Sequence, residues 1–222
     1  MVANYLRSTE LVSVDSTTIG PDLPYEVGIH CMVKMNEETV FIIGGSYFYY
    51  VSNRTTIVNP RDNFSMEFGP DLRIGRSYPA CGIFEVNNKK IVAVTGGEVG
   101  PDENGSSTEL WDPNSEDGWI LGNFYCRKSK KKLWYYFINL GPDLPLTSCI
   151  YGSVVTSPDG KGILLMGCTI DQNGIYELAE NSDGDLEWKK LNQQLESPRY
   201  GPIVMSIPNN MTVCQRRNEL PT

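Results

Sequence analysis

The sequence predicts an all-β repeat protein of the β-propeller class, and two repeated motifs support that prediction. The tetrapeptide Gly-Pro-Asp-Leu occurs three times, starting at Gly20, Gly69 and Gly141. An apolar strand ending in a glycine pair occurs at 40–45 and again at 91–97. The first two tetrapeptides are 49 residues apart and the two glycine pairs are 52 residues apart. Repeats of about 50 residues built from short strands are typical of propeller blades.

Each repeat predicts four strands. The Gly-Pro-Asp-Leu turn leads to a first strand, and a polar turn separates that strand from the one ending in the glycine pair. A variable loop, a third strand and a fourth strand with an aromatic residue follow. A third copy of the glycine strand is degraded, because Cys168 replaces the second glycine. A helical solenoid is excluded, since no segment keeps a 3.6-residue period for long.

These repeated positions resemble the kelch repeat family. The resemblance rests on two glycine pairs, two arginines before a first strand, and four downstream aromatic residues, namely Gly44, Gly45, Gly96, Gly97, Arg76, Arg199, Trp111, Trp119, Tyr176 and Trp188. It implies a kelch-type β-propeller in which the glycines allow close turns and the aromatic residues pack between blades. The free access of glycine to positive φ and the large buried area of aromatic side chains agree with these structural roles.

The chain predicts about four four-stranded blades in a single partial propeller that is incomplete or unclosed. Propellers of the family usually close with about six blades of roughly 50 residues, which needs about 300 residues. A closed ring of four blades is the alternative. The expected units are approximately 1–59, 60–112, 113–180 and 181–214, followed by a tail at 215–222.

Residues 123–141 form an atypical insertion that is basic and aromatic within an acidic protein. Removing them restores the Gly-Pro-Asp-Leu junction of the other repeats, and they correspond to 57 nucleotides, a multiple of three. One hypothesis is therefore a retained intron. The alternatives are an inserted hairpin, or a basic-aromatic loop that contacts RNA, a membrane surface or a partner.

Composition and motifs exclude several function classes. The net charge of −8 argues against a duplex nucleic-acid binder, and no apolar run is long enough to span a membrane. His30 is the single histidine, so neither HExxH nor a His-rich zinc cluster can form. The sequence contains no phosphate-binding glycine loop and no nucleophile elbow. We therefore predict no catalytic residue, no cofactor and no metal ligand.

The predicted function is a non-catalytic protein–protein interaction module that presents loops to a protein partner, and that is monomeric if the propeller is complete. Loops on a rigid scaffold are frequent binding sites, and exposed aromatic residues are frequent contact residues. The candidate binding residues follow the two glycine pairs and are Tyr47, Tyr49, Tyr50, Glu98, Asp102 and Glu103. For the tyrosines, an aromatic strand packed between blades is an equal alternative.

Two other hypotheses remain open. The kelch resemblance extends to copper radical oxidases similar to galactose oxidase, whose copper site needs two histidines and two tyrosines. This chain has one histidine, so such a site would lie outside it. Alternatively, the chain is a truncated or mispredicted gene product without a function of its own.

The compartment is suggested by sequons and cysteines. The N-terminal residues lack the features of a signal peptide. Nevertheless, four Asn-x-Ser/Thr sequons and six cysteines favour a secreted parent over a cytoplasmic one. The cysteines could be buried free thiols or could form disulfides, and six cysteines allow 15 pairings. The sequons begin at Asn53, Asn63, Asn104 and Asn210.

Overall fold

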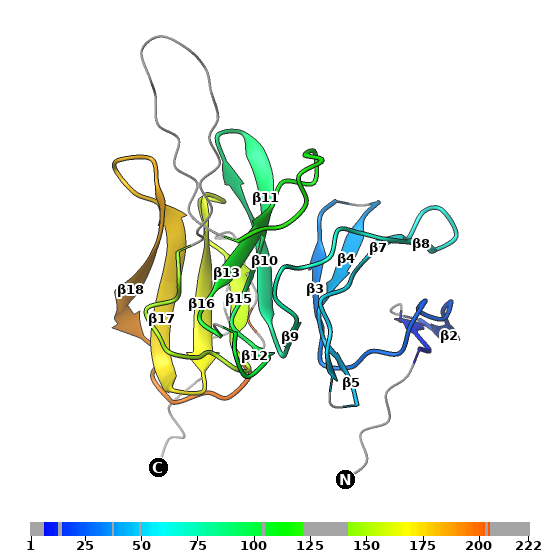
Figure 1. The fold of residues 1–222 in the computed structure, drawn as a ribbon, viewed down its shortest axis with the longest axis horizontal. Helices are drawn as coiled ribbons and strands as arrows, with labels where there is room; N and C mark the ends of the chain where they lie inside the picture. Colours follow the sequence, from blue (N-terminus) through cyan, green and yellow to red (C-terminus); the bar gives the residue numbers. More distant parts are fainter. Residues whose placement is uncertain are drawn as a thin grey trace, which may run out of the picture.

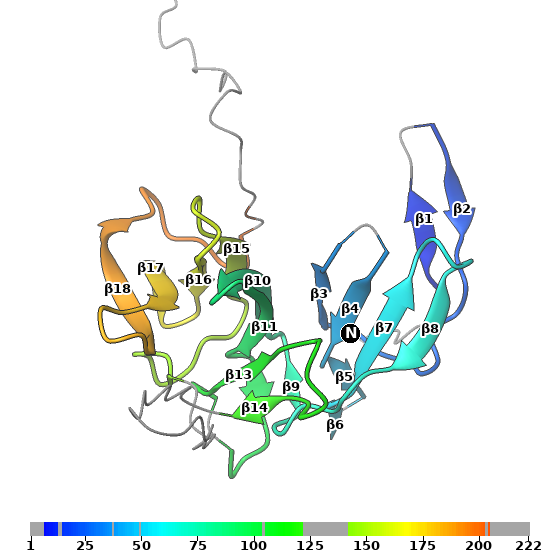
Figure 2. The ribbon, with the colours of Figure 1, turned by 90° about the horizontal axis from the view of Figure 1, so that it is seen from above.

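The computed structural model describes residues 7–12, 15–36, 38–48, 50–103, 105–121, 142–202 and 204. These residues form an all-β fold of antiparallel sheets, three of which have four strands each. The three sheets stand side by side (Figure 1). Seen from above, they fan out as an open arc, with β3, β10 and β15 on the inner side and β8, β14 and β18 on the outer side (Figure 2).

The first sheet has the order β3-β4-β7-β8, and a short hairpin of β5 and β6 stands between β4 and β7 in sequence. Every neighbouring pair is antiparallel, so each strand follows from a simple hairpin connection. The strands are β3 (Cys31–Lys34), β4 (Val40–Ile43), β5 (Ser46–Tyr47), β6 (Tyr50–Val51), β7 (Thr55–Asn59) and β8 (Ser65–Phe68).

The second and third sheets repeat this order. The second is β10-β11-β13-β14 and the third is β15-β16-β17-β18, while β9 pairs with β12 outside the sheets. In the second sheet the strands are β10 (Ala80–Val86), β11 (Lys89–Thr95), β13 (Thr108–Trp111) and β14 (Ile120–Leu121), and the separate pair is β9 (Arg76–Ser77) with β12 (Glu98–Val99). In the third they are β15 (Ser153–Thr156), β16 (Gly162–Cys168), β17 (Asp171–Glu180) and β18 (Leu186–Gln194).

The structure confirms the prediction of an all-β fold of antiparallel sheets. In the described residues there are three four-stranded sheets, and the N-terminal strands β1 (Glu10–Val12) and β2 (Thr17–Ile19) form a separate two-stranded sheet. Each fourth strand of the larger sheets pairs with the third strand before it. The insertion at 123–141 and the tail at 215–222 lie outside the described residues.

The Gly-Pro-Asp-Leu motif ties each unit to the third strand that precedes it. Its leucine is buried in all three copies. The leucine N–H groups donate to carbonyl oxygens at 2.7, 2.7 and 2.8 Å, in the pairs Leu23 to Arg7, Leu72 to Asn53 and Leu144 to Ser106. Because the first bond matches the other two, β1 and β2 occupy the places that the third and fourth strands take in the larger sheets.

The first glycine of each pair lets neighbouring units approach closely. Gly44 and Gly96 both have a φ of +65°. A Cβ on Gly44 would lie 2.6 Å from the carbonyl oxygen of Arg76, and one on Gly96 would overlap the carbonyl oxygen of Cys149. The next residue of each pair donates its N–H to that same carbonyl, at 2.8 and 2.7 Å. A side chain here would therefore push the next unit away.

In the third unit a disulfide-bonded cysteine, Cys168, stands where the other two units have the second glycine of the pair. Gly167 keeps a positive φ of +75° and lies against Pro202, whereas Cys168 bonds covalently to Cys149. In the first unit the second glycine, Gly45, approaches the side chain of Val27 in the segment that enters β3. The Cys149–Cys168 disulfide therefore links the end of the second strand to the segment entering the first strand, where the first unit has only the contact between Gly45 and Val27.

Two apolar cores fill the spaces between successive sheets. Trp111 and Trp119 lie in the core between the first and second sheets, and Trp111 packs on Phe41 with ring centroids 4.9 Å apart. Tyr176 and Trp188 lie in the core between the second and third sheets. All four aromatic residues of the kelch-like pattern are thus buried between sheets.

Two of these three tryptophans, Trp119 and Trp188, donate their indole N–H groups across the gap between sheets. Trp119 donates Nε1–H to the carbonyl of Pro70 at 2.8 Å, and Trp188 donates to the hydroxyl of Thr108 at 2.9 Å. Since each acceptor belongs to the preceding sheet or to the segment leaving it, these bonds fix how far the fourth strand lies from its neighbour.

A buried ion pair holds the entry to the second sheet. Arg76 and Glu109 are both fully buried, with 3.1 Å between Nη2 and Oε1. Arg76 also donates to the carbonyls of Gly96 and Ser107, and the Glu109 carboxylate accepts the backbone N–H of Arg73 at 2.6 Å. Desolvation lowers the pKa of Arg76, and Glu109 opposes that shift. A buried pair of this kind needs such additional bonds to offset its desolvation.

We expect Gly96→Ala to destabilise the fold much more than Gly160→Ala. Both glycines have a positive φ, but a Cβ on Gly160 would meet no atom within 4 Å. Gly160→Ala should therefore cost only the strain of the left-handed backbone, about 1 kcal/mol. Gly96→Ala should cost a further roughly 1–3 kcal/mol from overlap with Cys149. Denaturant unfolding measures both, and equal losses would contradict this role of the glycine.

The pair Cys31 and Cys81 forms a disulfide that joins the first strands of two sheets across a sequence separation of 50 residues. We expect the double variant Cys31→Ala/Cys81→Ala to lose about 2–4 kcal/mol of unfolding free energy, because closure of a long loop restricts the unfolded chain. Urea titration should show this difference under oxidising conditions. The difference should largely vanish when both proteins are reduced, and a persistent gap would argue against the disulfide.

Candidate functional site

The turns that lead into β3, β10 and β15 lie at one end of the arc, which we call the entry-turn end. The loops after the glycine pairs lie there too, because each second strand runs antiparallel to the first and ends where the first begins. In Figure 1 this end is at the bottom, where β5, β9 and β12 are labelled. Two of the loops that carry predicted binding residues therefore share an end with the entry turns.

The entry turns share an unusual backbone conformation. A positive φ recurs two residues before the first strand, at Ile29, Tyr78 and Tyr151, with values of 51°, 51° and 62°. Gly201 has a φ of 53° at the corresponding place after the third sheet. Such values are rare for bulky residues, so the surrounding contacts must hold them. One such contact is the bond from the Tyr78 N–H to the Ile29 carbonyl at 2.8 Å.

Three tyrosines form a row at this end. Tyr78 and Tyr151 lie in the turns that enter β10 and β15, and Tyr200 lies in the segment after β18. The ring centroids of Tyr78 and Tyr151 lie 4.3 Å apart, and those of Tyr151 and Tyr200 lie 6.1 Å apart. Tyr151 is 39% exposed and Tyr200 is 60% exposed, while Tyr78 is partly buried. We call these three residues the tyrosine row. Sequence reasoning missed these three residues, because tyrosine holds the positive-φ position in only two of the described turns, at Tyr78 and Tyr151, while Gly201 holds it beside Tyr200.

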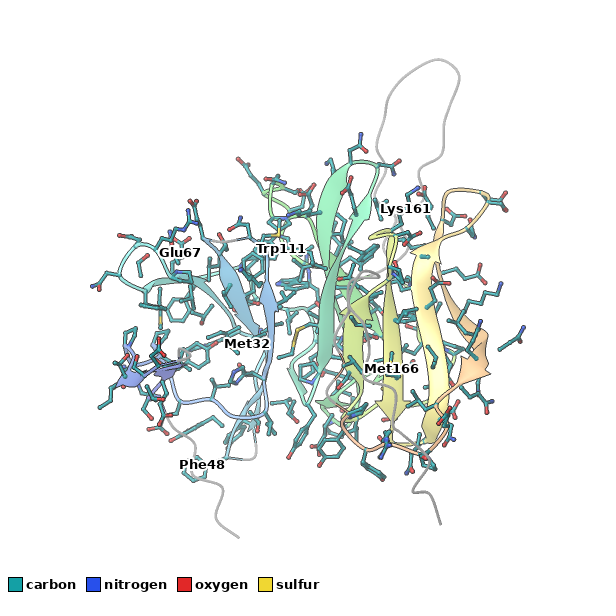
Figure 3. All side chains as sticks on the ribbon, turned by 180° about the vertical axis from the view of Figure 1, so that it is seen from behind. Met32, Phe48, Glu67, Trp111, Lys161 and Met166 are labelled. Carbon is teal, nitrogen blue, oxygen red and sulfur yellow. A yellow bond between two sulfur atoms is a disulfide. The ribbon has the colours of Figure 1, made fainter. Side chains whose placement is uncertain are left out.

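The predicted aromatic residues of the first unit lie at the same end. Tyr47 is 41% exposed and Tyr50 is 75% exposed on the β5–β6 hairpin, and Phe48 packs edge-on against Tyr47 with centroids 4.6 Å apart. Figure 3 labels Phe48 at the tip of this hairpin, away from the sheets. The hairpin therefore presents its aromatic rings to solvent. Tyr49 lies outside the described residues.

A cleft of about 590 Å³ opens beside this hairpin. Tyr47 and Tyr50 line it together with Tyr25, Glu26 and Arg54. The Arg54 guanidinium stands 5.3 Å from the centroid of the Tyr25 ring, and burial raises the pKa of the Tyr25 phenol. The cleft therefore combines aromatic walls with two cations, Arg7 and Arg54, and one carboxylate, Glu26.

The predicted acidic residues border the tyrosine row. Glu98 lies opposite Ser77 in the β9–β12 pair, and Ser77 directly precedes Tyr78 in sequence. The Glu98 carboxylate accepts a hydrogen bond from the Ser77 hydroxyl at 3.4 Å. Glu103 accepts the N–H of Gly100 at 3.2 Å within its own loop. Glu98, Asp102 and Glu103 are all exposed. The structure thus brings this loop to the tyrosines but leaves the Tyr47–Tyr50 hairpin on a separate sheet.

A polar cluster closes the start of β17 in the third sheet. Asp171 accepts bonds from Lys190, at 2.5 Å, and from the Tyr176 hydroxyl. These two bonds hold the pKa of Asp171 below its ordinary value, while burial and the neighbouring carboxylate raise the pKa of Tyr176. Tyr176 therefore has a buried ring with a hydroxyl that anchors an adjacent turn.

The single histidine lies in the segment that enters β3. His30 is partly buried, and burial lowers its pKa. Among the residues that the structure describes, no group of three histidine, cysteine, aspartate or glutamate side chains is arranged to hold a metal ion. In the same residues no helix is long and apolar enough to cross a membrane.

Comparison with known proteins gives no assignment. None of the protein-family models matches this chain. No curated protein matches it either.

We expect Asp171→Asn to destabilise the protein at pH 6 by roughly 1 kcal/mol and much less at pH 2–3. The lowered pKa of Asp171 means that its contribution is present above the ordinary aspartate pKa of about 3.9 and is lost as the pH falls through the folded-state value. Thermal or urea unfolding across this range measures the effect. Lys190→Met removes the same bond from its other side, and a pH-independent loss in both variants would contradict the assignment.

Proposed function

We propose that the chain is part of a kelch-type β-propeller that binds a protein partner without catalysis, through the entry-turn end. The observation that carries this proposal is the tyrosine row, which three successive repeats assemble from residues far apart in sequence. Tyrosine offers a large apolar area and a polar hydroxyl with few rotatable bonds, which makes it common at the energetic centre of protein interfaces.

The kelch-type assignment is supported by the way the repeats meet. Glycine pairs approach the backbone of the next unit, and aromatic residues of the later strands fill the space between sheets. Both features recur with the sequence period, as they do when propeller blades stack around an axis. The open arc of three sheets is in keeping with an incomplete or unclosed propeller.

The chemistry of the entry-turn end favours a partner with apolar and cationic side chains. Exposed tyrosine faces attract lysine and arginine as well as apolar groups. The neighbouring loop adds the exposed carboxylates of Glu98, Asp102 and Glu103, and Glu26 borders the cleft of the first unit. A peptide segment that alternates basic and apolar residues fits this surface.

A copper radical enzyme is the alternative that the kelch resemblance raises, and no described residue favours it. Such a site needs two histidines on the metal, whereas this chain supplies only His30. An oxidase built around this chain would depend on histidines from outside it.

The test is selection of binding peptides on the intact chain. We expect a random peptide library, panned on the immobilised protein, to enrich peptides that contain basic and apolar residues. Their affinity should fall at least tenfold for Tyr151→Ala and for Tyr200→Ala, since loss of a central aromatic contact commonly costs 2 kcal/mol or more. Isothermal titration with the enriched peptides measures this loss.

The matched control is Ile19→Ala, which removes an exposed apolar side chain from β2, in the two-stranded N-terminal sheet and not in the units that carry the tyrosine row. This variant should bind the enriched peptides as the unmodified protein does. The proposal fails if nothing is enriched, or if the tyrosine variants and the Ile19 variant bind equally well.

A further inference from the structure

One sequon lies on a turn that is well placed to carry a glycan. The turn between β7 and β8 spans residues 60–64 and includes Asn63, which is exposed and has a φ of 47°. The side chain of Asn59 holds this turn, because its Oδ1 accepts the N–H groups of Arg61 and Asp62 at 3.0 and 3.2 Å. The turn therefore keeps its shape through bonds that do not use the amide of Asn63.

The three residues of this sequon divide cleanly between solvent and core. Phe64 packs against the apolar cluster on the outer face of the first sheet. Asn63 and Ser65, the two residues that glycosyl transfer recognises, are exposed on either side of it. A glycan on Asn63 would therefore extend into solvent while Phe64 keeps the turn anchored.

The disulfides provide a second, independent observation. Cys31 is bonded to Cys81, and Cys149 is bonded to Cys168. Disulfides persist in oxidising compartments and are rare in the cytosol. Asparagine-linked glycosylation is a modification of that same export route. The sequon and the disulfides share no residue, and both indicate the oxidising compartment of the export route.

The position on the fold is compatible with binding at the entry-turn end. Figure 1 shows the β7–β8 turn projecting from the first sheet, well apart from β5 and β9. Asn53 provides a contrast, because it lines the cleft beside Tyr50 and its amide donates to the carbonyl of Leu72 at 3.4 Å. The sequons at Asn104 and Asn210 begin outside the described residues.

We propose that Asn63 is an N-glycosylation site and that the chain folds in the secretory pathway. The transfer joins the Nδ2 atom of Asn63 to C1 of an oligosaccharide carried on a lipid pyrophosphate. The C1–O bond to the pyrophosphate breaks, the lipid pyrophosphate leaves with the electron pair, and the amide nitrogen releases one proton to a base of the transferase. Binding at the entry-turn end does not depend on this glycosylation.

The test uses the full chain, expressed behind a cleavable secretion signal in glycosylating eukaryotic cells. Glycan removal with a peptide N-glycosidase in ¹⁸O-water converts a glycosylated asparagine to labelled aspartate, which peptide mass spectrometry locates. We expect the label at position 63 in most of the unmodified chain and in Ser65→Thr, which keeps the sequon. Ser65→Ala keeps Asn63 but destroys the sequon, so it should carry no label there.

Disulfide mapping in the same sample makes the result decisive. A peptide pair joined through Cys31 and Cys81 shows that the chain has folded in the oxidising compartment. Disulfide-bonded protein with unlabelled Asn63 overturns the proposal, whether the protein is found in the medium or in the internal membranes. Equal labelling of Ser65→Ala and the unmodified chain overturns it as well.

Discussion

The closest approach of backbone to backbone between successive units sets the geometry on which the rest of the fold depends. At Gly44 and Gly96 no side chain separates a second strand from the segment that enters the next sheet, and the carbonyls of Arg76 and Cys149 occupy that space. The following N–H group bonds to the same carbonyl, so the contact is directional as well as short. Because this contact recurs in successive units, it sets the distance and the orientation between neighbouring sheets.

The buried pair of Arg76 and Glu109 depends on that contact and reinforces it. The guanidinium bonds to the carbonyl of Gly96, and the carboxylate accepts backbone N–H groups just before β9. Taking both charges out of water costs several kcal/mol per ion, and their mutual attraction together with these hydrogen bonds offsets that cost. Such a pair contributes little to net stability, and its value here lies in specifying one position for the entry turn relative to the third strand.

Sequence periodicity predicted the antiparallel four-stranded pattern and the places of the glycines, because turns and close contacts require particular residues. Periodicity alone does not assign a strand such as β8 to a sheet, because strand pairing decides which sheet it joins. Cys168 looked like a degraded glycine, and only its bond to Cys149 shows that a different interaction occupies the place. The tyrosine row also escaped prediction, because contacts among Tyr78, Tyr151 and Tyr200 arise only once the sheets fan out.

At the entry turns the backbone conformation is the same in each unit although the side chain is not. Ile29, Tyr78, Tyr151 and Gly201 share a positive φ, yet their side chains differ. The buried positions around them therefore determine the turn, and the exposed residue can vary without changing the fold. In the first unit, where isoleucine replaces tyrosine, the aromatic rings come instead from the β5–β6 hairpin, with Tyr50 75% exposed. A repeat scaffold of this kind can change what its entry-turn end recognises by changing exposed residues such as Tyr50 and Tyr200, because the buried positions around each turn set its backbone.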